Sequence, residues 1–291
     1  MVDLFRSWSA ARKQMTIARK AKADAFRNMH HAPPILILPN AWDAVTARLF
    51  VKAGARAIAT TSAGIAATLG YADGQKVPRE LMVEAIARIA RVVDVPVTAD
   101  IEAGYADSPK DLGESIRAVI NAGAIGFNLE DAIGNSSQPL FAMEQQIERI
   151  RAAREAADNT NVRVVINART DVYLAKVGEP ASRFAETVHR LNAYHEAGAD
   201  CLFVPGVTDM PTLTQLVHSV AGPLNVLAGP GMPPVADLQR IGIARLSVGS
   251  AIMRATLAVA REAAVELLQI GTYNTFLDRN ISYSEVNELM K

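Results

Sequence analysis

The sequence predicts an α/β protein built as a (β/α)8, TIM-type barrel with extra C-terminal helices. Eight short apolar segments recur between residues 35 and 249, and an amphipathic segment follows each of them. Near-continuous apolar strands are what a parallel sheet covered on both faces requires. Half of the 291 residues are apolar, which is enough to bury a large core.

The predicted strands lie in ILILPNAW (35–42), AIATTSAG (57–64), VPVTADIEAG (95–104), AIGFNLED (124–131), VRVVINARTD (162–171), DCLFVPG (200–206), PLNVLAG (223–229) and ARLSVG (244–249). Eight strand–helix units in about 220 residues match the number of units and the length typical of this barrel. A doubly wound open sheet is the main alternative. It usually has fewer strands, and no Gly-x-Gly-x-x-Gly fingerprint follows the first strand here.

Helix caps, prolines and the distribution of charge indicate how the chain divides into segments. Asp107-Ser108-Pro109 supplies a helix cap followed by a proline in the first turn. We expect an N-terminal helical segment over 1–34, the barrel over 35–255, and C-terminal helices over 256–291 that can pack on the barrel or on a neighbouring subunit. The basic N-terminus is open to interpretation as a transit peptide or a nucleic-acid-binding arm, but its helical apolar spacing favours a solvated amphipathic helix.

Composition excludes several classes of function. Thirty basic and thirty acidic residues balance, so no global field points to nucleic acid. No apolar run approaches the length of a membrane span, so no membrane partner is expected. Cys201 is the only cysteine, which excludes a disulfide framework and favours a reducing compartment, the cytoplasm. No lysine lies within a predicted strand, which disfavours a Schiff-base aldolase.

Acidic residues gather at the carboxyl ends of two neighbouring strands, where a barrel forms its active site. In TADIEAGYAD (98–107), strand alternation predicts that Asp100 and Glu102 point the same way, and Glu130 ends the adjacent strand. Converging carboxylates repel one another unless a cation or a proton lies among them. Oxygen ligands suit Mg²⁺ or Mn²⁺. The alternative is that these acids cap helices or pair with lysines.

Other polar residues at strand ends admit two interpretations each. Arg169 can grip a substrate carboxylate with its planar fork, or it can form a salt bridge with Asp171 or Glu130. TTSAG at 60–64 offers hydroxyls and backbone amides for an anion, but a tight turn would look the same. GPG at 229–231 is a weaker candidate for holding a phosphate.

Five stretches together carry a family resemblance: LPNAWDAVTARLF, TTSAGIAATLGYADG, VTADIEAGY, GFNLED and INARTDVYL. In this order on successive strands, they resemble the isocitrate lyase / phosphoenolpyruvate mutase superfamily, in particular its short-chain, phosphonomutase-like members. The resemblance runs from about residue 27 to residue 250. It implies a barrel that forms a homotetramer or dimer, with a C-terminal helix exchanged between subunits, and an Mg²⁺-dependent site for 2-oxo acids.

The resemblance also implies roles for single residues. Arg169 would bind the substrate, and Asp73 would serve both the metal and catalysis. The metal-site carboxylates would be Asp73, Asp100, Glu102 and Glu130, several of them acting through waters. The residues facing the substrate's carboxylate or oxyanion would be Thr61, Ser62 and Ala63. Glu102 replaces an aspartate that is common in the better-known members.

The lid after the fourth strand departs from the resemblance. The lyases of the superfamily carry Lys-Lys-Cys-Gly-His there, and the cysteine serves as an acid. This chain has DAIGNSSQPLF instead, without cysteine or histidine. Cleavage of isocitrate or 2-methylisocitrate is therefore not expected. Asn135 and Ser136, with Ser137, are the polar lid residues expected to contact the reacting group.

These expectations favour a Mg²⁺-dependent lyase that cleaves a small 2-oxo acid through a pyruvate enolate, as in oxaloacetate decarboxylation. Decarboxylation needs an electron sink but no lid cysteine. The first alternative is carbon–phosphorus chemistry, as in a phosphonopyruvate hydrolase or a phosphoenolpyruvate phosphonomutase. An alternative of another class is a non-catalytic protein that binds a metal and a 2-oxo acid.

Overall fold

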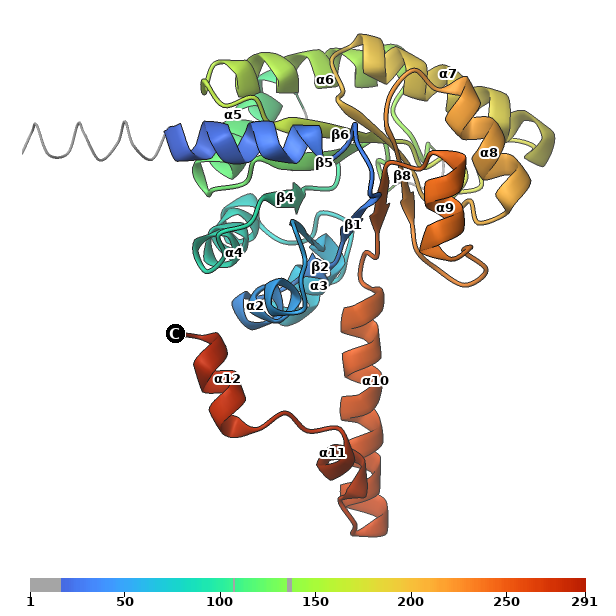
Figure 1. The fold of residues 1–291 in the computed structure, drawn as a ribbon. Helices are drawn as coiled ribbons and strands as arrows, with labels where there is room; N and C mark the ends of the chain where they lie inside the picture. The colour runs from blue at the N-terminus through green and yellow to red at the C-terminus, as the bar shows by residue number, and fades with distance from the viewer. Residues whose placement is uncertain (1–16, 107, 135–137) are drawn as a thin grey trace, which may run out of the picture.

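A parallel sheet closed into a barrel forms the centre of the computed structural model, which describes residues 17–106, 108–134 and 138–291. The order of the strands is β1-β9-β8-β7-β6-β5-β4-β3-β2, and all the paired strands are parallel (Figure 1). The strands are β1 Leu36–Leu38, β2 Asn40–Ala41, β3 Ile58–Thr60, β4 Val97–Asp100, β5 Gly126–Glu130, β6 Val165–Arg169, β7 Cys201–Val204, β8 Leu224–Leu227 and β9 Arg245–Ser247. Each lies within a predicted strand segment, so the barrel prediction is confirmed.

The barrel closes through its first strand, of which β1 and β2 are two halves. β1 pairs with β9 on one side, and β2 pairs with β3 on the other. Pro39 separates the two halves, because proline has no N–H to give to a ladder. Its carbonyl still accepts a hydrogen bond from Ala59 N at 3.0 Å. Nine assigned strands therefore make eight barrel strands.

Helices cover the outside of the barrel between successive strands. They are α2 Ala44–Lys52, α3 Ser62–Thr68, α4 Arg79–Arg91, α5 Pro109–Asn121, α6 Met143–Asp158, the 3-10 turn Pro180–Ser182, α7 Arg183–Glu196, α8 Met210–Ser219 and α9 Val235–Ile241. Ser108 caps α5 through a hydrogen bond from Asp111 N to its Oγ at 3.2 Å, and Pro109 follows in the first turn. The predicted cap is confirmed for these two residues.

The N-terminal helix over 17–28 closes the amino end of the barrel. Phe26 is fully buried and lies against Gly126, where an added Cβ would meet the ring at 2.9 Å. Arg27 forms an ion pair with Asp200, which also pairs with Arg154 from α6. The helix thus belongs to the packed body of the barrel.

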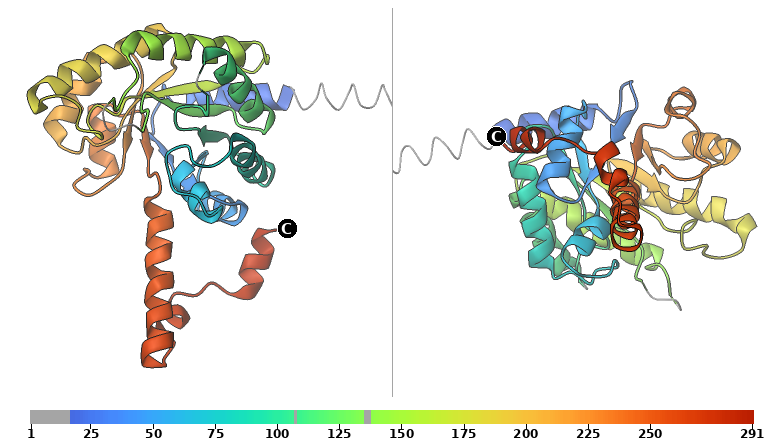
Figure 2. Two further views of the ribbon diagram at one scale, coloured as in Figure 1. Left: turned by 180° about the vertical axis from the view of Figure 1, so that it is seen from behind. Right: turned by 90° about the horizontal axis from the view of Figure 1, so that it is seen from below.

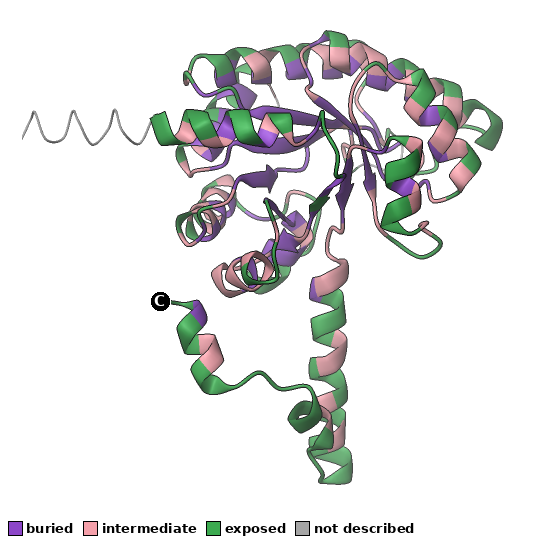
Figure 3. Cartoon of the chain, viewed as in Figure 1, coloured by how far each residue is buried: buried purple, intermediate pink, exposed green. Residues whose placement is uncertain are grey.

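The C-terminal helices leave the barrel. α10 Ala251–Val265 continues into a π-helical turn, Glu266–Ile270, and runs away from the sheet (Figures 1 and 2). Most of this arm is exposed (Figure 3), including Leu267 and Leu268. After α11 Asn274–Asp278, α12 Tyr283–Leu289 returns to α2, where Glu285 pairs with Lys52 at 2.9 Å. Among the described helices, none has the length and apolar content needed to cross a membrane.

Candidate functional site

A cavity of about 190 Å³ lies at the carboxyl ends of the strands, where barrels place their active sites. Its lining residues come from segments spread over the chain between residues 40 and 250. Its lining comprises Asn40, Thr61, Ser62, Ala63, Asp73, Asp100, Asn128, Arg169, Leu174, Phe203, Leu227, Ser247, Gly249 and Ser250. The structure therefore brings six of the predicted site residues together here: Thr61, Ser62, Ala63, Asp73, Asp100 and Arg169.

Asp100 is the buried carboxylate at the end of β4, and its surroundings fix its orientation. Ser62 donates to its Oδ2 twice, from the backbone N at 3.2 Å and from Oγ at 2.9 Å. Asn128 Nδ2 donates to Oδ1 at 3.4 Å, and the Asp100 backbone N donates to Thr60 Oγ1 at 2.9 Å. Three hydrogen bonds thus hold the carboxylate at the cavity wall, and a fourth holds the Asp100 backbone.

The residues 61–63 start α3, and their predicted polar groups are partly used within the protein. Thr61 caps the helix by accepting from Gly64 N at 3.3 Å. Ser62 faces Asp100, so its amide and hydroxyl serve that carboxylate rather than standing free. The segment is therefore the start of a helix rather than a tight turn, and its binding of an anion stays a prediction.

Asp73 lies opposite the strand ends, on the loop between α3 and α4. Burial raises the pKa of its carboxyl, and the negative charge of Asp100 raises it further. Two acids that face one cavity can share a cation between them. Asp73 and Asp100 are the two described acids among the cavity's lining residues.

Glu102 does not share the orientation that strand alternation predicts. β4 ends at Asp100, and Glu102 lies in a turn with φ of +52°, so the alternation of an extended strand does not reach it. Its Oε2 accepts from Gln75 N at 2.6 Å, and its Oε1 accepts from the Tyr105 hydroxyl. Burial, with the charges of Asp100 and Asp73, raises the pKa of Glu102 to about 7.

Glu130 and Asp171 hold Arg169 from two sides. Arg169 Nε and Nη2 donate to the two oxygens of Asp171 at 2.6 and 2.8 Å, and Nη1 pairs with Glu130 Oε2 at 2.8 Å. Burial raises the pKa of Glu130 well above its usual range, although Arg169 opposes this. The salt bridges foreseen for Arg169 therefore form, and its guanidinium also lines the cavity with N–H donors to spare.

The donor set suits a hard divalent cation that keeps part of its water shell. In the described parts of the chain, no three acidic, histidine or cysteine side chains are close enough to enclose an ion directly. Mg²⁺, however, usually meets one or two carboxylates and retains several waters. Asp100 and Asp73 face one cavity, so the residues present fit such an ion, with Glu102 and Glu130 further out.

A polar layer lies just inside the barrel at the base of the cavity, and its members Asn128 and Arg245 were not predicted from the sequence. Asn128 Oδ1 accepts from Asn167 Nδ2 at 2.7 Å and from Arg245 Nη2 at 3.2 Å. Arg245 is fully buried, and burial lowers its pKa to about 10. Asn128 stands two residues before Glu130, and Asn167 two before Arg169. The two-residue strand period was therefore the signal that could have found them.

The lid residues Asn135, Ser136 and Ser137 lie outside the described residues. The chain on either side of them forms a narrow antiparallel base, in which Ala132 bridges Leu140 and Ile133 N donates to Pro139 O at 2.9 Å. The proposed roles of Asn135 and Ser136 stay predictions.

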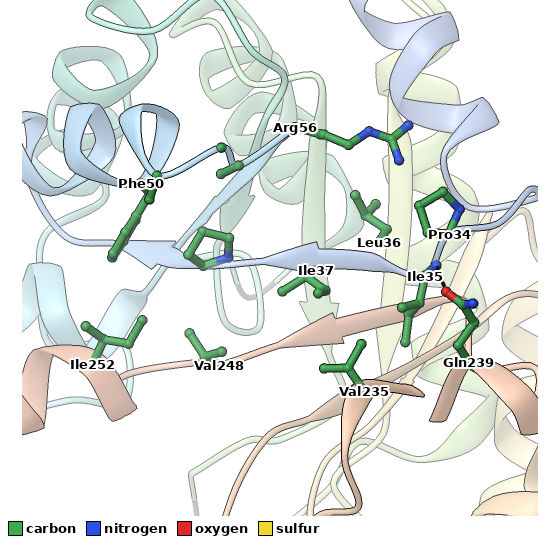
Figure 4. A pocket seen from close by; sticks show the side chains of 14 residues that line it. Pro34, Ile35, Leu36, Ile37, Phe50, Arg56, Val235, Gln239, Val248 and Ile252 are labelled. Atoms are coloured by element: carbon green, nitrogen blue, oxygen red, sulfur yellow. Dashed lines mark hydrogen bonds between the residues drawn. The ribbon is translucent and has the colours of Figure 1, made fainter. Parts of the chain in front are cut away.

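A second and larger cavity, of about 530 Å³, lies on the outer wall of the barrel (Figure 4). Apolar side chains from β1, α2, α9 and α10 line it, among them Ile37, Phe50 and Val235, and Arg56 stands at its edge. It has no carboxylate in its described lining and lies away from the strand ends. Its chemistry is that of a packing groove, so the smaller polar cavity is the candidate active site.

Comparison with known proteins identifies the family to which the chain belongs. The family model described as phosphoenolpyruvate phosphomutase matches residues 26–268. An uncharacterized protein of Mycobacterium tuberculosis is 32% identical, covering 90% of this chain and 94% of its own. The 2-methylisocitrate lyase of Escherichia coli is 29% identical, covering 83% and 84%. An oxaloacetate decarboxylase of Ectopseudomonas mendocina is 31% identical, covering 62% and 59%.

Two solved structures share the whole architecture. A protein of Burkholderia cenocepacia described as a lyase or mutase superposes with a TM-score of 0.87 at 37% identity, covering 93% of this chain and 96% of its own. A 2,3-dimethylmalate lyase superposes with a TM-score of 0.81 at 27% identity, covering 92% and 94%. The chain therefore belongs to the phosphoenolpyruvate phosphomutase family, within the phosphoenolpyruvate mutase/isocitrate lyase superfamily.

Proposed function

We propose that this protein is a Mg²⁺-dependent lyase that decarboxylates a small 2-oxo dicarboxylic acid of the oxaloacetate type. One observation carries the proposal. The cavity presents a fixed carboxylate pair, Asp100 and Asp73, and the guanidinium of Arg169, whereas none of its described lining residues is a cysteine, histidine or lysine. Such a site can hold a cation and an anionic substrate, but it offers no side chain for Schiff-base or thiol chemistry.

Each group in the cavity has a task in this reaction. Asp100 and Asp73 would hold Mg²⁺, with Glu102 and Glu130 acting through waters. When bound, Mg²⁺ supplies a Lewis acid that lowers the energy of an enolate. Arg169, aimed by Asp171 and Glu130, would bind a substrate carboxylate through its remaining N–H donors. The polar groups of Thr61, Ser62 and Ala63, with the hydroxyls of Ser247 and Ser250, would orient the rest of the substrate.

The bond changes require no protein acid. The bond from C3 to the distal carboxylate breaks, CO₂ leaves, and the electron pair forms the pyruvate enolate. Water then delivers a proton to C3. The chain's single thiol cannot assist, because Cys201 is fully buried on β7 and burial raises its pKa to about 12. Cleavage of 2-methylisocitrate in the manner of a lid-cysteine lyase is therefore not part of the proposal.

Carbon–phosphorus chemistry is the second candidate, and the match to the phosphoenolpyruvate phosphomutase model favours it. In that case Asn135, Ser136 or Ser137 would contact the transferred phosphoryl group. The test is a panel of 2-oxo acids and phosphonates, assayed with Mg²⁺ and with a chelator. Mg²⁺-dependent release of CO₂ and pyruvate from oxaloacetate supports the lyase, whereas phosphate release from phosphonopyruvate supports the second candidate. No turnover of any substrate indicates a binding protein.

The course of α10 supports a homotetramer or dimer in which subunits exchange their C-terminal helices. In a closed barrel the helix after each strand packs over the sheet. α10 follows β9 but runs away from it, and the apolar groove of Figure 4 lies over β1, where such a helix would pack. A second copy's α10 would fill this groove. The buried, protonated thiol of Cys201 accords with the cytoplasm as the proposed compartment.

A further inference from the structure

Asp131 is a fully buried acid that follows Glu130 at the end of β5, and it is not among the described residues that line the candidate cavity. Both of its carboxylate oxygens accept hydrogen bonds. Oδ1 accepts from Asp171 N at 2.9 Å, and Oδ2 accepts from the Thr170 hydroxyl at 2.7 Å and from the Tyr194 hydroxyl at 2.8 Å. A buried carboxylate requires such donors in place of water. The reaction proposed above uses none of these bonds.

Asp131 is bonded to three consecutive residues at the end of β6. Its backbone N donates to Arg169 O at 3.1 Å, and its side chain accepts from Thr170 and Asp171. Thr170 N still donates to Phe203 O on β7 at 3.0 Å. The next N–H along the chain, that of Asp171, donates to the Asp131 carboxylate instead. The Asp131 side chain therefore fixes the backbone at the point where the hydrogen bonds to β7 end.

The placement of Asp171 matters because this residue holds Arg169. Its two oxygens accept from Arg169 Nε at 2.6 Å and from Nη2 at 2.8 Å. A bidentate pair of this kind fixes the plane of the guanidinium as well as its position. A rotation of the Asp171 backbone would turn that plane, and with it the N–H donors that face the cavity. The direction of the Arg169 side chain thus depends on the bond from Asp171 N to Asp131.

Helix α7 holds the Asp131 carboxylate from outside the sheet. Arg190 Nη1 donates to Oδ2 at 3.3 Å and to the Tyr194 hydroxyl oxygen at 3.1 Å, and Tyr194 donates in turn to the same Oδ2. Both side chains are buried. A buried polar network whose members are satisfied is rigid. The carboxylate therefore has one fixed orientation between α7 and the segment after β6.

Asp200 is a similar acid at the other end of the barrel, just before β7. It is largely buried, it accepts from Ile166 N at 2.8 Å, and it pairs with Arg27 and Arg154. Its contacts resemble those of Asp131 in kind, since each carboxylate binds one backbone N–H and at least one arginine. Asp200 is bonded to no residue that lines the cavity, so it provides a matched example of a structural carboxylate.

We propose that Asp131 is a positioning residue for Arg169: it fixes the Asp171 backbone and thereby aims the Arg169 guanidinium into the cavity. The inference rests on the proposed function, in which Arg169 binds the substrate carboxylate. Asp131 itself touches neither the substrate nor the metal. Its loss should therefore weaken the binding of an anionic ligand while the affinity for Mg²⁺ is kept. A purely structural carboxylate would lower stability and leave both affinities unchanged.

Three variants and one control separate these roles. Asp131→Ala removes the acceptor for Asp171 N. Asp131→Asn is the conservative variant, because its amide oxygen can still accept from Asp171 N while its NH₂ donates to a neighbouring hydroxyl. Tyr194→Phe keeps the carboxylate and removes one of its donors, so it tests the arrangement even if Asp131→Ala folds poorly. Asp200→Ala is the control for the loss of a buried carboxylate away from the cavity.

Two measurements that need no turnover follow the effect. Hydrogen exchange of the peptide over 169–176 reports the Asp171 amide. Calorimetry gives the affinity for Mg²⁺ and then, with Mg²⁺ present, the affinity for oxalate, a dianion with the planar O–C–C–O unit of a 2-oxo acid.

In Asp131→Ala we expect exchange over 169–176 to rise and oxalate affinity to fall, each by about tenfold, the factor for losing a hydrogen bond to a charged group. Mg²⁺ affinity should stay within about threefold of the wild type. Tyr194→Phe should move exchange and oxalate affinity in the same directions by about two- to fivefold, and Asp131→Asn should restore both to within about threefold. Asp200→Ala should lose stability but keep both affinities.

Three results would overturn the proposal. The first is wild-type exchange over 169–176 in Asp131→Ala, or in Tyr194→Phe if the alanine variant does not fold. The second is an oxalate affinity in the same variant that stays at the wild-type value or falls only in step with that for Mg²⁺. The third is an equal loss of oxalate affinity in Asp200→Ala.

Arg169→Lys distinguishes a failure of this inference from a failure of the proposed function. If Arg169→Lys binds oxalate as tightly as the wild type does, Arg169 is not the group that binds the substrate, and that part of the proposed function fails. The exchange data then still decide whether Asp131 fixes the Asp171 backbone.

Discussion

Asn128 donates a hydrogen bond to Asp100 Oδ1 at 3.4 Å and fixes the lower side of the cavity carboxylate. The orientation of its amide is set from below, because Arg245 and Asn167 both donate to its oxygen. A buried cation on β9 is thereby linked to the proposed metal ligand on β4 through one amide. The Asn128 amide thus gives the buried Arg245 guanidinium a neutral acceptor, and the negative charge of Asp100 opposes the lowering of the Arg245 pKa by burial.

We expect Asn128→Leu to lower the free energy of unfolding by about 2–4 kcal/mol, because Arg245 Nη2 and Asn167 Nδ2 lose their acceptor while they stay buried. Mg²⁺ affinity should fall as well, since Asp100 loses a donor. Denaturant unfolding and calorimetric titration measure the two effects. Asn128→Asp is the matched control, which keeps an acceptor for both donors and should cost less stability. Wild-type stability in Asn128→Leu would refute the linkage.

Arg169→Lys should lower kcat/KM by about ten- to a hundredfold, because a point charge cannot replace a planar fork that binds a carboxylate. Steady-state kinetics on the substrate found in the panel measures this. Asp171→Asn is the control, since it keeps the guanidinium and weakens one of its anchors, so its loss should be smaller. A variant Arg169→Lys that loses stability while keeping its kinetics would return Arg169 to a structural role.

The barrel was predictable because its signal is local. Apolar runs ending in polar residues mark each strand, and all eight runs contain an observed strand, with Pro39 as the one interruption. The cap at Ser108 is equally local. The candidate cavity followed from geometry, since the ends of parallel strands meet at one face, and Asp100 and Arg169 line it together.

The remainder depends on tertiary contacts that no local pattern encodes. Glu102 lies two residues after Asp100, but the strand ends between them and the backbone turns to a positive φ. Asn128 and Arg245 lie within strands, where a polar residue resembles an exposed edge position until the closed barrel buries it. The departure of α10 from the barrel is likewise a matter of packing, because its amphipathic sequence resembles that of a covering helix.

The metal-free protein should lose stability as the pH rises from about 4.5 to 7. Burial, with the charges of Asp100 and Asp73, raises the pKa of Glu102 from 4.5 to about 7 in the folded protein. A carboxyl with a raised folded-state pKa contributes stability that is fully present below its unfolded pKa and is lost as the pH passes its folded pKa. Asp73 and Glu130 shift in the same direction.

Thermal unfolding in a chelator, scanned from pH 4.5 to 8, measures this loss. Across that range, the free energy of unfolding of Glu102→Gln should rise relative to that of the wild type by up to about 3 kcal/mol, because glutamine has no proton to lose. Added Mg²⁺ should restore the wild type at the upper end, because an ion that binds the folded state stabilises it. A difference between the two proteins that does not change with pH would show that Glu102 stays ionised throughout.

If α10 is exchanged between subunits, the protein is a dimer or tetramer. A charged residue introduced on either side of the contact should then dissociate the oligomer. Leu268 on the arm is 82% exposed and Ile37 in the groove is 45% exposed, although both are large and apolar. Leu268→Asp and Ile37→Asp should therefore each shift the mass measured by light scattering towards the monomer. Burying an unpaired carboxylate is costly. A monomeric wild type would refute the exchange.

Cys201 is the chain's only thiol. It is fully buried on β7, and burial raises its pKa to about 12, so it should stay protonated and resist alkylation in the native state. Cys201→Ser should keep full activity at saturating substrate. Cys201 lies close enough to the buried Arg245 guanidinium for their charges to interact, so a serine hydroxyl there has a polar neighbour and should cost little unfolding free energy, with Cys201→Ala as the apolar control. Isocitrate and 2-methylisocitrate should not be cleaved, because no cysteine stands in the cavity to act as the acid. Replacing Asn135, Ser136 and Ser137 by alanine should instead slow turnover of the true substrate. Inactivation by Cys201→Ser at wild-type stability, or succinate release from isocitrate, would place the catalytic acid elsewhere and assign the protein to the cysteine-dependent lyases of its superfamily.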